Sequence, residues 1–446
     1  MPVYEMNERY EYFKSEWRKC RDCIAGQKAV KAARTRYLPA LGGSQSYARY
    51  EKYIKRALFF NATRRTAEAL TGFLFRKSPI FTPDNLDLLD SFTNSSGGFL
   101  AFIQGLAMEV ISVGRVILVV DSPIAGGDPK ITYYRTEDFI NWKINASGKL
   151  IQAVFKEKVL SADSADEFSN KKEIQYRVFD IFRERYRQRI FKEVKPGEWA
   201  PVLEIFPTMN GASLSELPIV VINSVNLLPE PSEPPLIDVV NVNLSHYRSS
   251  ADLESGRHFT GFPTPWASGF DIPGESLEIG SVAWVSDNPN AKAGFLEFTG
   301  QGLGSLENAL TEKAQMMSVL GARILEAQKK STEAADTHRL RYAGEQSILS
   351  KAAGFLGAGI SVAMRICANW RKLPDADGFG VSLNKDYAST TADPQLVTTL
   401  FGALQGGAIS YDTWFYNLKR WELAPEGQTL DDELGLIEAR NSNPES

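Results

Sequence analysis

The sequence predicts an α+β protein in which a β-rich section is flanked on both sides by helices. Between residues 115 and 223, short runs of β-branched and aromatic residues alternate with turn residues, which is typical of antiparallel strands. On both sides of that section, apolar residues recur at helical spacing. The chain has 446 residues, 43% of them hydrophobic and 23% charged, so it can bury a sizeable core and divide into two or three compact units.

The N-terminal section is predicted to be helical. Apolar residues in the segment 47–75 recur at helical spacing and RKSP then ends the segment, so one long amphipathic helix is expected there. A second helical stretch covers residues 99–112. Gly114 then begins GRVILVVDSP, a continuous β-branched run that is typical of a buried strand.

A meander of short strands is predicted to follow. Its runs are KITYYRT, FINWKI, LIQAVFKEKV, QYRVFDIFRERYRQRIFKEV, WAPVLEIF and LPIVVIN, and SADSADEFSNKKE between two of them is expected to be a mobile hairpin tip. The fourth run has an arginine at every second position, which gathers all four side chains on one face of a strand. These residues are Arg183, Arg185, Arg187 and Arg189. The face either neutralises successive phosphates of a nucleic acid or is the solvated face of a sheet, and the second interpretation is favoured.

A stiff connector separates this section from the next unit, because NLLPEPSEPPL contains four prolines in eleven residues. Residues 237–254 are predicted to form a helix, and a short stretch punctuated by glycine and proline follows it. A second helix then carries an apolar stripe. The stripe consists of Leu303, Leu306, Leu310, Met317, Leu320, Ile324 and Leu325. The sequence therefore predicts a small β-rich insert between two helices.

The C-terminal third is predicted to be helical. Hydrophobic periodicity stops after Leu325 and resumes near Leu340, so residues 331–338 form a polar break. A long helix follows to about residue 372, and its glycines are expected to let neighbouring helices approach closely. The acidic DDE at residues 431–433 predicts another helix start.

Composition narrows the range of functions. The net charge of −4 excludes a polycation that coats DNA, so any DNA contact must be local or weak. Three cysteines, Cys20, Cys23 and Cys367, are too few for a disulfide framework and indicate a reducing compartment, with the CRDC pair interpreted as ordinary helix cysteines. The start of the chain lacks a secretory signal pattern. Arg365 interrupts the apolar run 352–370, so we expect a packed helix and no membrane.

The sequence offers no recognisable catalytic motif. It contains no GxxxxGK[ST], no HExxH and no GxSxG, and its three histidines are scattered. GQGLGSL at residues 300–306 lacks the phosphate-binding lysine and is interpreted as a helix start. We therefore expect no enzyme, no cofactor and no metal site.

The order of these elements resembles the portal proteins of tailed bacteriophages, the head-to-tail connectors. The amino-acid sequence also resembles one branch of that family in segments spread over nearly the whole chain. These segments are YIKRALFFNATRRTAEALTGFLFRKSP, VGRVILVVDSP, EDFINWKI, GFLEFTGQGLGSLENAL, RLRYAGEQSILSKAA and GAISYDTW. The resemblance implies a ring, typically a dodecamer, at one capsid vertex of the virion, assembled in the host cytoplasm. Double-stranded DNA enters and leaves through such a ring, and the terminase supplies the ATPase.

The family's layout divides the chain into seven parts. In order, these are 1–234, the wing with its N-terminal helices and β meander; 235–257, the first stem helix; 258–302, the clip; 303–330, the second stem helix; 331–338, the tunnel loop; 339–372, the long wing helix; and 373–446, the crown. The resemblance also implies contacts with the major capsid protein, the scaffold and a head–tail adaptor.

Three sets of residues are candidate sites under this resemblance. Expected at the DNA channel are Lys329, Lys330, Ser331, Thr332, Glu333, Asp336, Thr337 and His338. Expected at clip contacts with subunits, terminase or adaptor are Phe259, Phe262, Trp266, Phe270 and Trp284, with a local mini-core as the alternative. The arginine face lies in the wing, where a neighbouring subunit, capsid protein or scaffold is its expected contact. Between Leu303 and Glu345, six basic and six acidic residues balance, as suits a conduit that does not grip DNA.

Two other classes of function stay open. Another head–tail structural or adaptor protein would also lack catalytic motifs, and ring stoichiometry separates it from a portal. A metal-dependent nucleic-acid enzyme would need clustered carboxylates, for which the sequence offers no convincing set.

Overall fold

The computed structural model describes residues 2–42, 46–122, 127–161, 168, 170–261, 264–270, 287–296, 300, 302–322, 335–385, 394–421, 423–424 and 428–442. The chain divides into two compact units, Met1–Lys385 and Asp386–Ser446. Helices and antiparallel sheets occupy separate stretches of the chain, which confirms the predicted α+β class.

Short helices form the N-terminal part of the first unit. They are α1 (Glu8–Ala25), α2 (Gln27–Ala32), the 3₁₀ turn η1 (Arg34–Arg36), α3 (Tyr47–Arg56) and α4 (Ala62–Leu74). The single helix predicted over 47–75 is therefore wrong. Ala57 leaves the helical conformation with ψ 138°, and the Asn61 side chain caps α4 by accepting a hydrogen bond from the Arg64 amide at 3.2 Å. A good internal N-cap thus divides a continuous apolar pattern.

A three-stranded sheet lies at the centre of the first unit. After β1 (Ile80–Thr82), α5 (Leu86–Asp90) and α6 (Gly98–Val113) comes β2 (Arg115–Asp121), which pairs with β3 (Lys130–Arg135) and with β11 (Ile219–Asn223). The residues of β2 from Arg115 to Val120 are almost completely buried, which confirms the buried strand predicted from GRVILVVDSP.

The predicted meander is a five-stranded antiparallel sheet in the order β4-β5-β6-β7-β8. Its strands are β4 (Phe139–Ile144), β5 (Leu150–Leu160), β6 (Lys172–Phe182), β7 (Arg185–Lys195) and β8 (Glu198–Ile205). Leu160 pairs with Lys172, so SADSADEFSNKKE joins two strands of a hairpin as predicted, although most of its tip lies outside the described residues. The small pair β9 (Thr208–Met209) and β10 (Ala212–Ser213) follows.

The long helix α10 (Ala335–Trp370) supports the three-stranded sheet. A Cβ on Gly359 would lie 2.5 Å from Ile222 Cγ1 of β11, and one on Gly357 would lie 3.1 Å from the Val381 carbonyl oxygen. The glycines therefore permit a close approach, but to strands rather than to the helices that were predicted. Leu349–Trp370 is long and apolar enough to cross a membrane, yet Leu356, Ile360 and Met364 are buried in the core of this unit. The 3₁₀ turn η3 (Ala376–Gly378) and β14 (Gly380–Ser382), which pairs with β1, follow.

The second unit contains α11 (Pro394–Gln405), α12 (Tyr411–Arg420) and α13 (Leu430–Ser442). Phe401 and Trp414 pack with their ring centroids 5.7 Å apart. Thr429 and Asp432 exchange hydrogen bonds in which each side chain accepts from the other's amide, at 3.1 and 2.8 Å. This reciprocal cap confirms the helix start predicted from the acidic DDE.

Three buried thiols agree with the interpretation of the cysteines. Cys20, Cys23 and Cys367 are free and buried in helices. Burial raises the pKa of the Cys20 thiol to about 12, so this sulfur is an inert core group at neutral pH.

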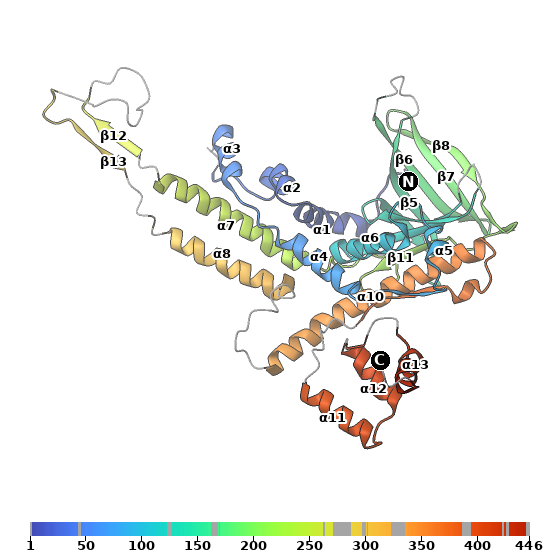
Figure 1. Ribbon diagram of the computed structural model, residues 1–446. Helices are drawn as coiled ribbons and strands as arrows, with labels where there is room; N and C mark the ends of the chain where they lie inside the picture. Colours follow the sequence, from blue (N-terminus) through green and yellow to red (C-terminus); the bar gives the residue numbers. More distant parts are fainter. Residues whose placement is uncertain are drawn as a thin grey trace. The chain divides into compact units, whose positions relative to one another are not determined.

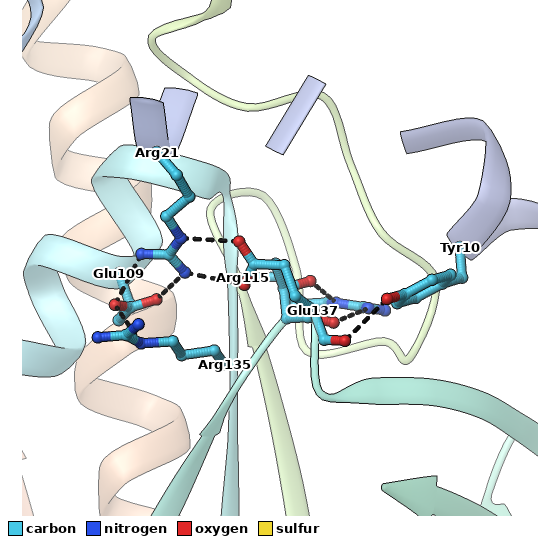
Figure 2. A network of polar contacts seen from close by, with 7 residues as sticks. Tyr10, Arg21, Glu109, Arg115, Arg135 and Glu137 are labelled. Carbon is cyan, nitrogen blue, oxygen red and sulfur yellow. Dashed lines mark hydrogen bonds and ion pairs between the residues drawn. The ribbon is translucent and has the colours of Figure 1, made fainter. Parts of the chain in front are cut away.

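Arg21 joins three elements at the edge of the central sheet (Figure 2). Its guanidinium donates to both carboxylate oxygens of Glu109 on α6, at 2.9 and 2.5 Å, and to both of Glu137 in the β3–β4 turn, at 2.7 and 3.0 Å. Arg135 adds a longer contact to Glu109 at 3.6 Å. Because these pairs are bidentate and largely shielded from water, they fix the position of α1 on the sheet.

Arg115, the first residue of β2, holds the proline-rich connector. Its fully buried guanidinium donates to Thr136 Oγ1 at 2.8 Å and to the Pro229 carbonyl at 2.6 Å. It lies 5.1–5.3 Å from the ring centroids of Trp17, Phe139 and Trp142. Burial lowers the pKa of Arg115 to about 9. The guanidinium therefore ties the connector to β2 and the β3–β4 turn.

Asn223, the last residue of β11, holds the same connector from a second side. Its amide donates to the carbonyls of Leu228 and Glu230, at 2.5 and 3.0 Å. The connector thus has a fixed path, and the helix that follows it, α7 (Ile237–Gly261), leaves the body of the unit from a defined point.

Candidate functional site

The most distinctive part of the chain is a helical hairpin with a strand pair at its tip (Figure 1). α7 (Ile237–Gly261) leads into β12 (Thr264–Ser268), and β13 (Lys292–Leu296) leads back to α8 (Leu303–Met317). The predicted helix at 237–254 is confirmed and extends further, α8 starts within GQGLGSL as predicted, and the insert between the helices contains strands. This hairpin is the candidate functional site.

Small residues let the two helices lie close together. A Cβ on Gly256 would lie 2.6 Å from Leu303 Cδ2, and Ser249 and Ser255 are buried on α7. The helices are antiparallel, because Arg257 near the end of α7 pairs with Glu307 near the start of α8 at 2.8 Å, while Ser249 accepts from Lys313 Nζ at 2.5 Å. The Arg257 pair is about half exposed, so packing holds the helices together more than this ion pair does.

α7 is also anchored to the N-terminal helices. The fully buried Asn243 accepts from Thr63 Oγ1 at 2.9 Å and donates to the Phe60 carbonyl at 2.7 Å. Tyr53 donates to Asp252 at 2.5 Å. Buried hydrogen bonds of this kind fix the helix rotation, so α7 presents one defined side to α8.

The end of α8 leaves apolar side chains in water. Met316, Val319 and Leu320 are 52, 41 and 43% exposed. Of the predicted stripe, Met317 is buried, Leu303, Leu306 and Leu310 are partly buried, and Leu320 is exposed. Ile324 and Leu325 lie outside the described residues.

The second stem helix predicted over 303–330 is not continuous. Regular α-helix ends at Met317, residues Ser318–Ala322 form a π-helical turn, and Gly321 within it has non-helical dihedral angles. A Cβ on Gly321 would lie 2.8 Å from Thr66 Cγ2 and 3.3 Å from Val239 Cγ2. The missing side chain therefore lets this turn pack against α4 and the base of α7.

The predicted clip aromatics are partly described. Phe259 lies in the last turn of α7 with the Arg49 guanidinium 5.9 Å from its ring centroid, and Trp266 lies on β12 opposite Gly294; both are 42% exposed. Phe270 follows the strand and is partly buried, while Phe262 and Trp284 lie outside the described residues. Phe295 on β13, which the sequence analysis did not select, is 59% exposed.

Most of the predicted tunnel loop lies outside the described residues, including Lys329, Lys330, Ser331, Thr332 and Glu333. Asp336, Thr337 and His338 belong to the first turn of α10, so the predicted loop 331–338 extends too far towards the C-terminus. Alanine-rich sequence and an acidic residue near a helix start explain the earlier start of α10.

The arginine face differs from its prediction in two ways. Arg183 is in the hairpin turn with φ 51°, so β7 carries only Arg185, Arg187 and Arg189. Arg187 pairs with Asp180 at 2.8 Å and with Glu204 at 2.9 Å, and Arg189 pairs with Asp180 at 2.6 Å. Carboxylates on the neighbouring strands β6 and β8 thus neutralise Arg187 and Arg189, whose side chains are only 13 and 23% exposed, so these two arginines do not form a solvated face. The expected contact with a neighbouring subunit, capsid protein or scaffold stays a prediction.

The sequence analysis missed a concentration of positive charge on α2, α3 and α4. Residues 27–68 contain ten basic and two acidic residues, a net charge of +8 in a chain whose total is −4. A local charge count along the sequence would have found it. Among the residues that the structure describes, no three His, Cys, Asp or Glu side chains group as a metal site would require.

Comparison with known proteins gives a partial family match. Residues 235–371, which run from the start of α7 to the end of α10, match the model of a family described as a domain of unknown function (DUF4055). No curated protein matches the sequence.

Solved structures with some similarity come from particles of gene transfer agents. A chain from the neck of an empty particle computed with C6 symmetry has a TM-score of 0.41 and 12% identity, covering 84% of this chain and 93% of that one. A chain from the native virion has a TM-score of 0.41 and 11% identity, covering 89 and 99%. A chain from the native neck computed with C12 symmetry has a TM-score of 0.38 and 13% identity, covering 80 and 89%. Scores this low do not establish a shared fold.

Proposed function

We propose that this protein is a structural subunit of a phage-like virion, and more specifically a portal protein that forms a ring at one capsid vertex. The observation that carries the proposal is the anchored α7–α8 hairpin with its exposed apolar end. The described part of one chain leaves the side chains of Met316, Val319 and Leu320 exposed to solvent. A neighbouring copy related by rotation would cover the same surface on every subunit of a closed ring.

The proposed ring serves as a conduit for double-stranded DNA and as a docking platform. The equal numbers of basic and acidic residues between Leu303 and Glu345 suit a channel wall, because tight phosphate binding would brake a moving duplex. The exposed Trp266 and Phe295 of the strand pair suit a contact with terminase or a head–tail adaptor. Capsid protein and scaffold are the proposed contacts of the wing.

The test is the assembly state of the purified protein. We expect a closed ring with a central hole in negative-stain images and one large species in mass photometry. The double variant Met316→Asp, Leu320→Asp should shift the protein to small species, since it places charge in the proposed subunit contact. The matched control Leu160→Asp, Val194→Asp changes two exposed apolar residues on the β meander, 64 and 51% exposed, and should assemble normally.

The outcome separates the portal from its alternatives. A folded wild-type protein that stays monomeric at micromolar concentration would contradict the proposal. An open oligomer of low order would instead favour another head–tail structural protein.

A further inference from the structure

The positive charge of residues 27–68 forms a surface that the proposed ring does not explain. The ten basic residues are Lys28, Lys31, Arg34, Arg36, Arg49, Lys52, Lys55, Arg56, Arg64 and Arg65, against Glu51 and Glu68. The rest of the chain has forty basic and fifty-two acidic residues, a net charge of −12. The positive charge is therefore concentrated in one helical segment of an otherwise acidic chain.

Hydrogen bonds and an ion pair bring α2 and η1 together with α3 and the link between α3 and α4. Lys31 Nζ donates to the Lys55 carbonyl at 3.1 Å, which joins α2 to the end of α3. The Phe59 amide donates to Gln27 Oε1 at 3.1 Å, and Arg34 pairs with Glu51 at 2.5 Å. Segments up to thirty-two positions apart are thus brought together.

The cations of α3 lie on the side of the helix that faces water. Tyr50, Tyr53 and Ile54 are its buried side. At 100° per residue, Lys52 and Lys55 lie opposite this side, and Arg49 and Arg56 flank it; Arg56 is partly buried and the other three are exposed. Lys52 and Lys55 therefore project away from the contact that α3 makes with α7, whereas Arg49 lies at its border, with its guanidinium 5.9 Å from the Phe259 ring centroid.

Most of these cations have no neutralising partner. Among the described residues, Arg34, Arg36 and Arg64 pair with carboxylates, and Lys31 is used by a backbone carbonyl. The other six form no ion pair within the described part of the chain. We call them the basic helical surface: Lys28, Arg49, Lys52, Lys55, Arg56 and Arg65. This distinguishes them from Arg187 and Arg189, which carboxylates neutralise.

We propose that the basic helical surface binds the phosphate backbone of nucleic acid. Three of its six residues are lysines, which are depleted at the centres of protein–protein interfaces but suit phosphate contacts. A helix of ten residues such as α3 is about 15 Å long, and a duplex of that length carries about nine phosphate charges. The surface thus has the charge and length to contact one side of a duplex without reading its sequence.

The test is the salt dependence of binding to a duplex of about twenty base pairs, measured by fluorescence anisotropy on the full-length protein. The triple variant Lys28→Gln, Lys52→Gln, Lys55→Gln should weaken binding at least about tenfold at low salt. It should also flatten the slope of log K against log salt by about 2.7, since each lost phosphate contact removes about 0.9. The control Lys143→Gln, Lys158→Gln, Lys172→Gln removes the same charge from exposed positions on the β meander and should bind like wild type.

Each result decides the proposal. The proposal is overturned if the two triple variants lose equal affinity for the duplex, or if neither loses affinity. It is also overturned if polyglutamate binds as tightly as the duplex, because the surface would then suit an acidic protein. Mass photometry of the same samples keeps this inference separate from the proposed ring. Variants that form rings but bind the duplex like wild type would overturn only the nucleic-acid surface, whereas duplex binding by monomers would support it without a ring.

Discussion

Arg115 shows how one buried side chain positions a distant element. Its guanidinium is enclosed by three aromatic rings and bonds to the connector carbonyl of Pro229. Replacing Arg115 with Met should lower the free energy of unfolding by about 3 kcal/mol, because Pro229 and Thr136 lose their buried donor. Urea denaturation of the variant and wild type measures this difference.

Arg135→Met is the matched control for that experiment. The Arg135 side chain is 59% exposed, and its contact with Glu109 is long, at 3.6 Å. The loss of this contact should therefore lower the free energy of unfolding by less than about 1 kcal/mol. Equal and small losses in both variants would show that the Arg115 contacts do not stabilise the connector.

The arginines of the β6–β7 hairpin show what sequence alone could not supply at the residue scale. Alternation predicted that Arg185, Arg187 and Arg189 share a face, since strand geometry dictates it. It did not predict that Arg183 and Glu184 both adopt positive φ in the turn, which usually favours Asn or Gly. Nor did it predict the ion pairs, because strand register decides which carboxylate lies opposite which arginine.

At the scale of elements, the α7–α8 packing contains a pH-sensitive group. His246 on α7 lies near Phe60 and Lys313, and burial together with the Lys313 ammonium lowers its pKa below the usual value of 6.5. As the pH falls, His246 therefore binds a proton in the unfolded chain before it does so in the folded protein, which favours unfolding. Stability should fall as the pH drops below about 6.5 and level off below the folded-state pKa.

Urea midpoints at pH of about 7.5 and about 5.5 test this prediction. The wild type should lose more stability between the two values than His246→Gln does, because the variant removes this proton uptake and leaves other titrating groups in place. An equal loss in both proteins, or a larger loss in the variant, would contradict it.

Elements were predictable where a local pattern and a local boundary agreed. The strands of the meander satisfy both conditions, since turn residues separate period-two runs. The helix predicted over 47–75 failed because the apolar spacing continues across Asn61, whose capping role depends on the backbone it meets. The break at Gly321 was also hidden, because a packing contact with Thr66 and Val239 requires it.

At the scale of the whole molecule, the order of elements was predictable and the exposed surfaces were not. The connector, the hairpin and the long helix follow from prolines, periodicity and polar breaks that the sequence displays directly. The exposed Met316 and the unpaired Lys52 depend on which side of a helix the fold covers. The sequence therefore predicts which helices and strands form, whereas binding partners are inferred from the surfaces that the fold leaves exposed.

Lys329 and Lys330 provide the last prediction, which concerns the proposed DNA path. Both lie outside the described residues, next to the start of α10. If they face the channel, replacing both with Gln should leave the ring intact but change the amount of DNA packaged or retained, because two phosphate contacts per subunit are lost. If they only cap the preceding helix, the same change should lower the melting temperature and leave packaging unchanged.

A packaging assay beside a melting curve distinguishes the two roles. The control Lys143→Gln, Lys158→Gln removes the same charge from the β meander and should alter neither result. Rings that melt earlier but package like wild type would remove both lysines from the DNA path. Altered packaging at an unchanged melting temperature would place them in it, because a channel contact acts on the moving duplex and adds nothing to the stability of the empty ring.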